Sequence, residues 1–135
     1  YAVFCLIKPA LVMGYEINPE TKRLVIVQQA GIKNLPDTAT HGYTFGEGIP
    51  GWVMQNQNTV VLADISKEQY LQVDHWAKVL DLRSYAAVPL IVRGSAIGII
   101  AMYSPEANFF HDSNLLIAQL AAQLYGLNLA GQRTQ

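Results

Sequence analysis

The fold is decided by two stretches, Phe45-Gly-Glu-Gly-Ile-Pro-Gly-Trp-Val53 and Ser84-Tyr-Ala-Ala-Val-Pro-Leu-Ile-Val-Arg-Gly-Ser-Ala-Ile-Gly-Ile-Ile-Ala-Met-Tyr103. In the first, three glycines and a proline lie within six residues and precede an apolar run. This pattern predicts a sharp turn followed by a short helix over residues 49–57. In the second, strand-like runs over 85–92 and 96–103 meet at Arg93-Gly94, the two-residue connection of a tight hairpin.

The two strands of this hairpin are apolar on both faces, because Tyr85 and Ala87 alternate with Ala86 and Val88. A sheet with no polar face must be covered on both sides. Pro89 cannot donate a hydrogen bond to a ladder, so it suggests a bulge or a locally unpaired position.

The remaining chain supplies further strands and one long helix. Alternating apolar residues over 11–17 and 24–27 flank turn chemistry at 18–22 and predict a second hairpin. Residues 59–62 read as a buried strand, and 66–80 as an irregular helix beside a pocket. The last helix begins at Asp112-Ser113, both of which are good N-caps.

These stretches together resemble the GAF domain, a small-ligand-binding regulatory module. The likeness covers about residues 10–131, and it continues through Ser104-Pro105-Glu106 into the last helix. It implies an α+β fold related to PAS and profilin-like folds, with a central antiparallel sheet of five or six strands and helices on both faces. We expect a single domain over residues 1–135, taken from a larger multidomain signalling protein, because a chain of 135 residues can bury one core.

Composition excludes several classes of partner. The net charge is −1, and charged residues make up 14% of the chain without any basic run, so neither nucleic acid nor a membrane surface is an expected partner. Cys5 is the only cysteine, which excludes an internal disulfide and favours a reducing, cytoplasmic location.

The last helix carries no charged residue from Ser113 to Gln132. We expect the stripe Leu116, Ile117, Leu120, Leu124 and Leu127 to pack on the sheet. A second stripe then needs a cover, which predicts a homodimer or a contact with another domain of the parent chain. Its members are Leu115, Ala118, Ala122, Tyr125 and Leu129.

The expected ligand site combines an aromatic wall with a few polar contacts, the usual composition of a small-molecule pocket. Trp76 and Tyr85 have an alternative role as ordinary core residues, and Asp64 as a helix N-cap. The candidate ligand-binding residues are Asp64, Tyr70, Asp74, His75, Trp76, Arg83, Ser84 and Tyr85.

No catalytic or metal site is expected. The histidines His41, His75 and His111 lack the paired spacing of metal ligands. In the related family, bilin-binding members carry a cysteine ahead of the hairpin, at or near Val73 here, where this chain has none, so we predict no covalent bilin. His75 keeps haem as an open alternative.

Two other activities of the family find little support. Free-methionine-sulfoxide reductases of this fold use several cysteines, and one thiol cannot form a relay. The motif of cyclic-nucleotide-binding members is matched only in part by Asn108, Phe109, Phe110 and Asp112.

The sequence therefore predicts a non-catalytic sensory domain without a resident cofactor. It would bind an unidentified small molecule non-covalently and signal through its last helix to an output domain, such as a histidine kinase, cyclase or transcription regulator in a two-component system. The alternative is a dimerisation module that binds no ligand.

Overall fold

A tight hairpin forms the centre of the computed structural model. Strand β5 (Ser84–Val92) pairs antiparallel with β6 (Ser95–Ser104). The connecting residues Arg93 and Gly94 both have positive φ, at 53° and 79°, as a type I′ turn requires. The sequence prediction of this hairpin is confirmed.

The structure describes residues 9, 11–31, 42–44, 47–67 and 75–133. For residues 75, 79, 112 and 125–133 it describes the backbone and not the side chains.

A second hairpin extends the sheet from the other edge of β6. Strand β1 (Leu11–Ile17) pairs antiparallel with both β6 and β2 (Arg23–Gly31). In the turn between β1 and β2, the side-chain Oδ1 of Asn18 accepts hydrogen bonds from the backbone N–H groups of Glu20 and Thr21. Such an Asx turn is the structure that the polar run at 18–22 predicts.

Two short strands complete a six-stranded sheet with the order β3-β2-β1-β6-β5-β4. Strand β3 (Tyr43–Thr44) pairs with β2, and β4 (Val60–Leu62) pairs with β5, both antiparallel. The expected antiparallel sheet of five or six strands is confirmed.

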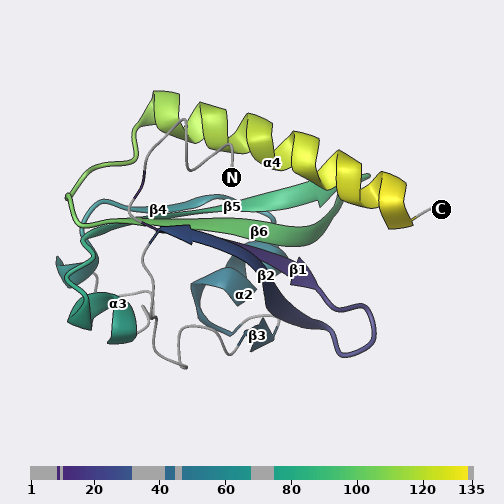
Figure 1. Ribbon diagram of the computed structural model, residues 1–135, viewed down its shortest axis with the longest axis horizontal. Coiled ribbons are helices and arrows are strands. Elements are labelled where there is room, and N and C mark those ends of the chain that lie inside the picture. Colours follow the sequence, from purple (N-terminus) through teal and green to yellow (C-terminus); the bar gives the residue numbers. More distant parts are fainter. Residues whose placement is uncertain (1–8, 10, 32–41, 45–46, 68–74, 134–135) are drawn as a thin grey trace.

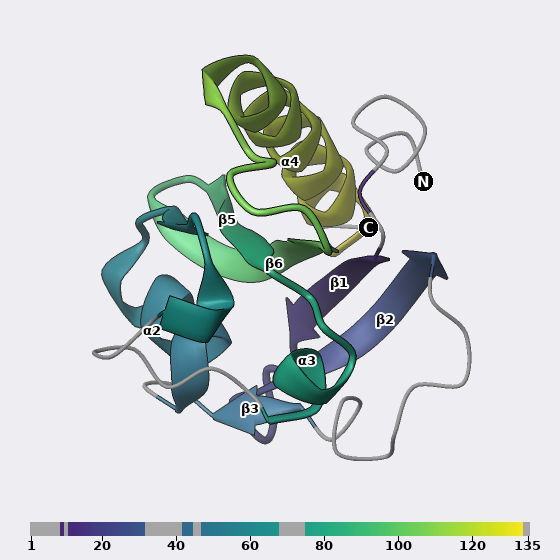
Figure 2. The same cartoon turned by 90° about the vertical axis from the view of Figure 1, so that its left-hand side faces the viewer.

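Helices lie on both faces of this sheet, as expected (Figures 1 and 2). Helix α4 (Asp112–Arg133) crosses one face. Helix α2 (Gly48–Asn56), the 3₁₀ turn η2 (Ile65–Lys67) and helix α3 (His75–Val79) lie on the other. Of the irregular helix expected over 66–80, the structure describes the end of η2 at Lys67 and helix α3 from His75; residues 68–74 lie outside the described part. No helix of the described ranges is both long and apolar enough to cross a bilayer.

The alternation of β5 divides its side chains between two hydrophobic clusters. Tyr85 and Ala87 belong to the cluster on the α2 and α3 side, whereas Ala86 and Val88 belong to the cluster under α4. The expectation that both faces are covered is therefore confirmed.

Helix α4 packs through the face opposite to the one that the sequence analysis assigned. Ala118 and Ala122 are fully buried in the cluster under α4, whereas Leu116, Leu120 and Leu124 are 56%, 54% and 70% exposed. At about 100° per residue, the three leucines lie on the far side of the helix from the alanines. The predicted packing of these leucines on the sheet is therefore wrong.

The prediction that the second stripe faces outward toward a partner is therefore also wrong. Ala118 and Ala122 contact the sheet instead of a partner, and Leu115 packs against the same cluster. Of the remaining residues, Ile117 does pack toward the sheet as expected. The side chains of Tyr125, Leu127 and Leu129 lie outside the described part. The small alanine side chains allow the helix backbone to approach the strands closely.

Close packing between β1 and β6 gives a testable prediction. A Cβ atom on Gly98 would overlap the backbone carbonyl oxygen of Tyr15 and lie 2.9 Å from Leu90 Cδ1. The change Gly98→Ala should therefore destabilise the protein by about 1–3 kcal/mol or more, because a backbone oxygen cannot move aside cheaply. Urea unfolding monitored by circular dichroism measures this loss.

The matched control is Gly14→Ala in β1, where the added Cβ would meet its nearest atom, Gln28 Cβ, at an ordinary 3.8 Å. It should change stability by much less. Equal effects of the two substitutions would contradict this packing of β1 against β6.

Candidate functional site

An aromatic cluster lies on the α3 side of the sheet. The ring centroids of Trp76 and Tyr103 are 5.0 Å apart, and those of Tyr85 and Tyr103 are 4.8 Å apart in an edge-to-face arrangement. All three side chains are buried. They come from α3, β5 and β6, so the cluster joins the short helix to the central hairpin.

The position of α3 depends on this contact. The helix has five residues, too few to be stable by backbone hydrogen bonding alone. Trp76 and Ala77 bury its inner face, and the turn that follows has Asp81 at a φ of 57°. The location of α3 is therefore set by what lies beneath Trp76.

An ion pair between Asp64 and Arg83 lies at the start of β5. Arg83 Nε donates to Asp64 Oδ1 at 2.8 Å, and Arg83 Nη2 donates to Asp64 Oδ2. Ser66 adds two hydrogen bonds to Asp64 Oδ1, from its hydroxyl at 2.6 Å and its backbone N–H at 3.1 Å. The Asp64 side chain is 11% exposed, and that of Arg83 is 43% exposed.

These contacts fix the charge of the carboxyl group. The hydrogen bond from Arg83 holds the pKa of Asp64 far below its usual range, with help from Ser66, and the same bond raises the pKa of Arg83. Asp64 is therefore ionised at neutral pH and poorly suited to general acid–base work. It anchors η2 to the sheet, while the Arg83 side chain stays 43% exposed.

Backbone hydrogen bonds gather three segments at this corner. The N–H of Ile65 donates to the carbonyl of Arg83, and the N–H of Arg83 donates to the carbonyl of Ser104 at 2.8 Å. The N–H of Asn108, in the loop before α4, donates to the carbonyl of Ala63 at 2.8 Å. The ion pair thus lies where chain segments on the α3 side meet the segment that leads into α4.

The comparisons with known proteins agree with this architecture. The family model described as "GAF domain" matches residues 15–130. The chain belongs to the GAF domain family. A comparison with curated proteins gave no significant match.

Solved structures of low sequence identity share the GAF fold. The GAF domain of a phosphoenolpyruvate-protein phosphotransferase from Coxiella burnetii matches with a TM-score of 0.83 and 17% identity, over 98% of this chain and 78% of that one. Free methionine-R-sulfoxide reductase from Neisseria meningitidis, solved with its substrate, matches with a TM-score of 0.79 and 23% identity, over 98% and 74%. A domain of a putative two-component sensor histidine kinase from Sinorhizobium meliloti 1021 matches with a TM-score of 0.78 and 15% identity, over 98% and 87%. This fold therefore occurs in both signalling proteins and enzymes.

The structure brings together only some of the ligand-site residues that the sequence analysis selected. Trp76 and Tyr85 both contact Tyr103, which the sequence analysis did not select, and Asp64 and Arg83 bind one another. Tyr70, Asp74 and the side chain of His75 lie outside the described part. Among the side chains that are described, no group of three or more His, Cys, Asp or Glu residues could hold a metal ion.

Ser84 lies apart from the other candidate ligand-site residues that the structure describes. Its hydroxyl donates to the carbonyl of Glu106 at 2.7 Å, and the neighbouring Ser104 hydroxyl accepts from the Glu106 N–H at 3.1 Å. Successive strand residues point to opposite faces, so Ser84 lies on the α4 side while Tyr85 faces the aromatic cluster. Ser84 therefore holds the loop after β6 in place, and it does not line the Trp76 face.

The ion pair predicts a specific pH dependence of stability. Because Arg83 depresses the pKa of Asp64 in the folded state, the pair stabilises the fold fully above the ordinary aspartate value of about 3.9, and this stabilisation is lost as pH falls below it. Asp64→Asn should lower the urea midpoint at pH 7, and its difference from the wild type should shrink between about pH 5 and pH 3.

Glu20→Gln is the control, since Glu20 is exposed in the β1–β2 turn. It should leave the midpoint nearly unchanged at pH 7. A gap between wild type and Asp64→Asn that stays constant down to pH 3 would contradict the assigned role of the pair.

Proposed function

We propose that this GAF domain is a non-catalytic sensor that binds a small molecule non-covalently on the Trp76 face and relays the event through α4 to an output domain. The aromatic cluster is the observation that carries the proposal. The rings of Trp76, Tyr85 and Tyr103 are buried where α3 packs on the sheet, and a ligand that moves α3 would contact them near Arg83, whose side chain is 43% exposed at the head of β5. Aromatic surface with one charged group suits a small organic ligand, preferably one bearing an acidic group.

Contacts around the Asp64–Arg83 ion pair connect the proposed ligand site to the start of α4. Occupancy beneath Trp76 would shift α3, because its five residues depend on that packing. The chain from Leu82 to Tyr85 connects α3 to the ion pair, and the loop before α4 is bonded to Ala63 next to that pair. A small displacement of α3 is thereby coupled to the start of α4.

Two features of the side chains support the non-catalytic assignment. Reduction of a sulfoxide by protein thiols leaves a disulfide, which requires two cysteines, and this chain has only Cys5. The low pKa of Asp64 also removes this carboxyl group as a proton donor. A cytoplasmic location agrees with the lone thiol.

The ligand proposal is tested by a thermal-shift screen over nucleotides, amino acids, oxo-acids and tetrapyrroles. A ligand at 100 times its Kd stabilises the fold by about 2.7 kcal/mol, which raises the Tm by several degrees. The chain has two tryptophans, so Trp52→Phe leaves Trp76 as the only one. Its fluorescence should change on binding.

The control is Trp76→Phe, which keeps an aromatic ring and leaves only Trp52, a side chain 37% exposed on α2. Its fluorescence should not respond. A response from Trp52 alone, or no stabilising compound in the screen, would count against the site. Consumption of a free methionine sulfoxide with a thiol reductant would contradict the non-catalytic assignment.

The second candidate function is a self-association module without a ligand, and the leucine stripe of α4 (Leu116, Leu120 and Leu124) favours it. These side chains recur at every fourth residue and are more than half exposed. The surrounding helix from Ser113 to Gln132 is free of charge, so nothing repels a second copy. We propose that two copies pair through this stripe, which would also place two output domains side by side in the sensor.

Charge placed on this stripe should dissociate the dimer. Leu116→Glu combined with Leu120→Glu should raise the dimer Kd at least tenfold, because an unpaired carboxylate in an apolar interface costs well over 1.4 kcal/mol. Both leucines are more than half exposed, so the monomer should remain folded by circular dichroism. Sedimentation velocity measures the mass.

Gln28→Glu with Gln29→Glu is the matched control, because it adds the same charge on exposed positions of β2. It should leave the dimer intact. A wild-type protein that stays monomeric at millimolar concentration would overturn the interface. Dissociation of the dimer together with an empty ligand screen would favour the second candidate over the sensor.

A further inference from the structure

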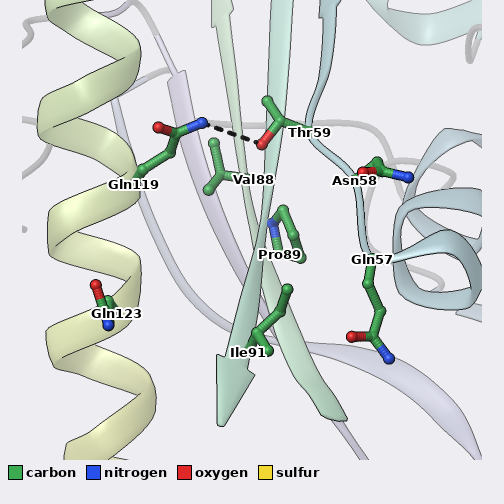
Figure 3. A pocket seen from close by; sticks show the side chains of 8 residues that line it. All are labelled: Gln57, Asn58, Thr59, Val88, Pro89, Ile91, Gln119 and Gln123. Carbon is green, nitrogen blue, oxygen red and sulfur yellow. Dashed lines mark hydrogen bonds between the residues drawn. The ribbon is translucent and has the colours of Figure 1, made fainter. Parts of the chain in front are cut away.

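A groove of about 370 Å³ opens along the edge of β5, between α4 and the segment that follows α2 (Figure 3). Its floor is formed by Val88, Pro89 and Ile91 of β5. One wall is the segment Gln57–Thr59 between α2 and β4, and the other is α4. The lining residues are Gln57, Asn58, Thr59, Val88, Pro89, Ile91, Gln119 and Gln123.

The chemistry of the lining is uniform. Four of the eight residues carry a carboxamide and one carries a hydroxyl, while the other three are apolar and none is ionisable. A carboxamide both donates and accepts hydrogen bonds. Because no side chain in the groove can neutralise a charge, the fitting occupant is uncharged and has donors and acceptors of its own.

The backbone at the floor adds a second feature. Strand β4 pairs with β5 only from Tyr85 to Ala87, although β6 pairs with the whole of β5. The cause is the end of α2, where Gln57 adopts a left-handed conformation with φ of 56° and turns the chain away. Within the described ranges, residues 88–92 therefore have a strand partner on one side only.

An open strand edge offers alternating N–H and C=O groups to an added strand. Pro89 withdraws at most one donor from this edge, since proline has no N–H. It also limits long, unspecific pairing, as prolines on edge strands commonly do. The edge thus suits a short added strand better than an extended sheet.

One contact limits how such a strand would lie. Gln119 Nε2 reaches Thr59 Oγ1 at 3.5 Å and bridges the two walls near Val88 (Figure 3). Gln123 follows one helical turn later and has no such bridge drawn to the facing wall. The groove is therefore spanned at the Val88 end and bordered by carboxamides toward Ile91.

We propose that this groove, defined by the eight lining residues above, binds a short extended segment of an uncharged peptide, which pairs with the edge of β5 at residues 88–92. The carboxamides of Gln57 and Gln123 would bond the peptide backbone from either wall, and Ile91 would pack against one of its apolar side chains. The site differs from the ligand site proposed at Trp76, so either can fail while the other stands.

The proposal is tested with a pool of blocked hexapeptides, acetylated and amidated at their ends, built from Ala, Ser, Thr, Val and Asn. A second pool carries two Asp residues per peptide. Each pool is passed over the immobilised 135-residue chain, and retained peptides are measured by mass spectrometry. The uncharged pool should be retained at least tenfold more than the acidic pool. In ¹H–¹⁵N spectra, the best peptide should shift the backbone amides of Val88 and of residues 90–92, since Pro89 has no N–H.

The groove variant is Gln57→Ala with Gln123→Ala, and it should lower the affinity of that peptide at least tenfold. Gln28→Ala with Gln29→Ala removes two exposed carboxamides on β2 and should leave the affinity unchanged. Equal retention of both pools, no retention, or equal affinity of both variants would each overturn the proposal. So would a loss of dimer mass in the groove variant without peptide binding, since the occupant would then be a second copy.

Discussion

The pairing of β5 with β6 is the constraint on which the rest of this structure depends. Both strands are apolar on both faces, so the hairpin needs a covering layer on each side of the sheet. The left-handed turn at Arg93-Gly94 fixes where the pairing begins. Every functional feature described above lies on or beside this hairpin. The aromatic cluster occupies one face, α4 the other, and the groove its open edge.

One irregularity in that pairing builds the candidate ligand site. The register shifts between Leu90 and Ile91, so that Tyr85 faces Tyr103 across the hairpin. Without the extra residue, the turn would place Met102 opposite Tyr85, with its side chain on the same face. The bulge therefore brings two tyrosine rings together beneath Trp76. Pro89 indicated an irregularity near this position, although its effect on Tyr103 could not be read from the sequence.

The choice of the face that α4 buries follows from shape more than from hydrophobicity. Ala118 and Ala122 allow close approach to the small side chains of β5, such as Ala86, and the leucines then point away. A stripe of leucines is the stronger hydrophobic signal in the sequence, which is why the sequence analysis assigned the wrong face to the sheet. Because the helix has no charged residue from Ser113 to Gln132, its sequence offers no charged face that would mark the outer side.

The sequence by itself determined the local structures: the two hairpins, the glycine-rich entry into α2, the antiparallel sheet covered on both sides and the long uncharged helix. These depend on turn residues and on apolar periodicity, which act over a few positions. Only the tertiary structure decided which face of α4 is buried and that Asp64 pairs with Arg83. It also decided that the Ser84 hydroxyl binds the Glu106 carbonyl, and that β4 leaves part of β5 without a second strand partner. Each of these depends on the distance between segments far apart in the chain, and no local pattern specifies that distance.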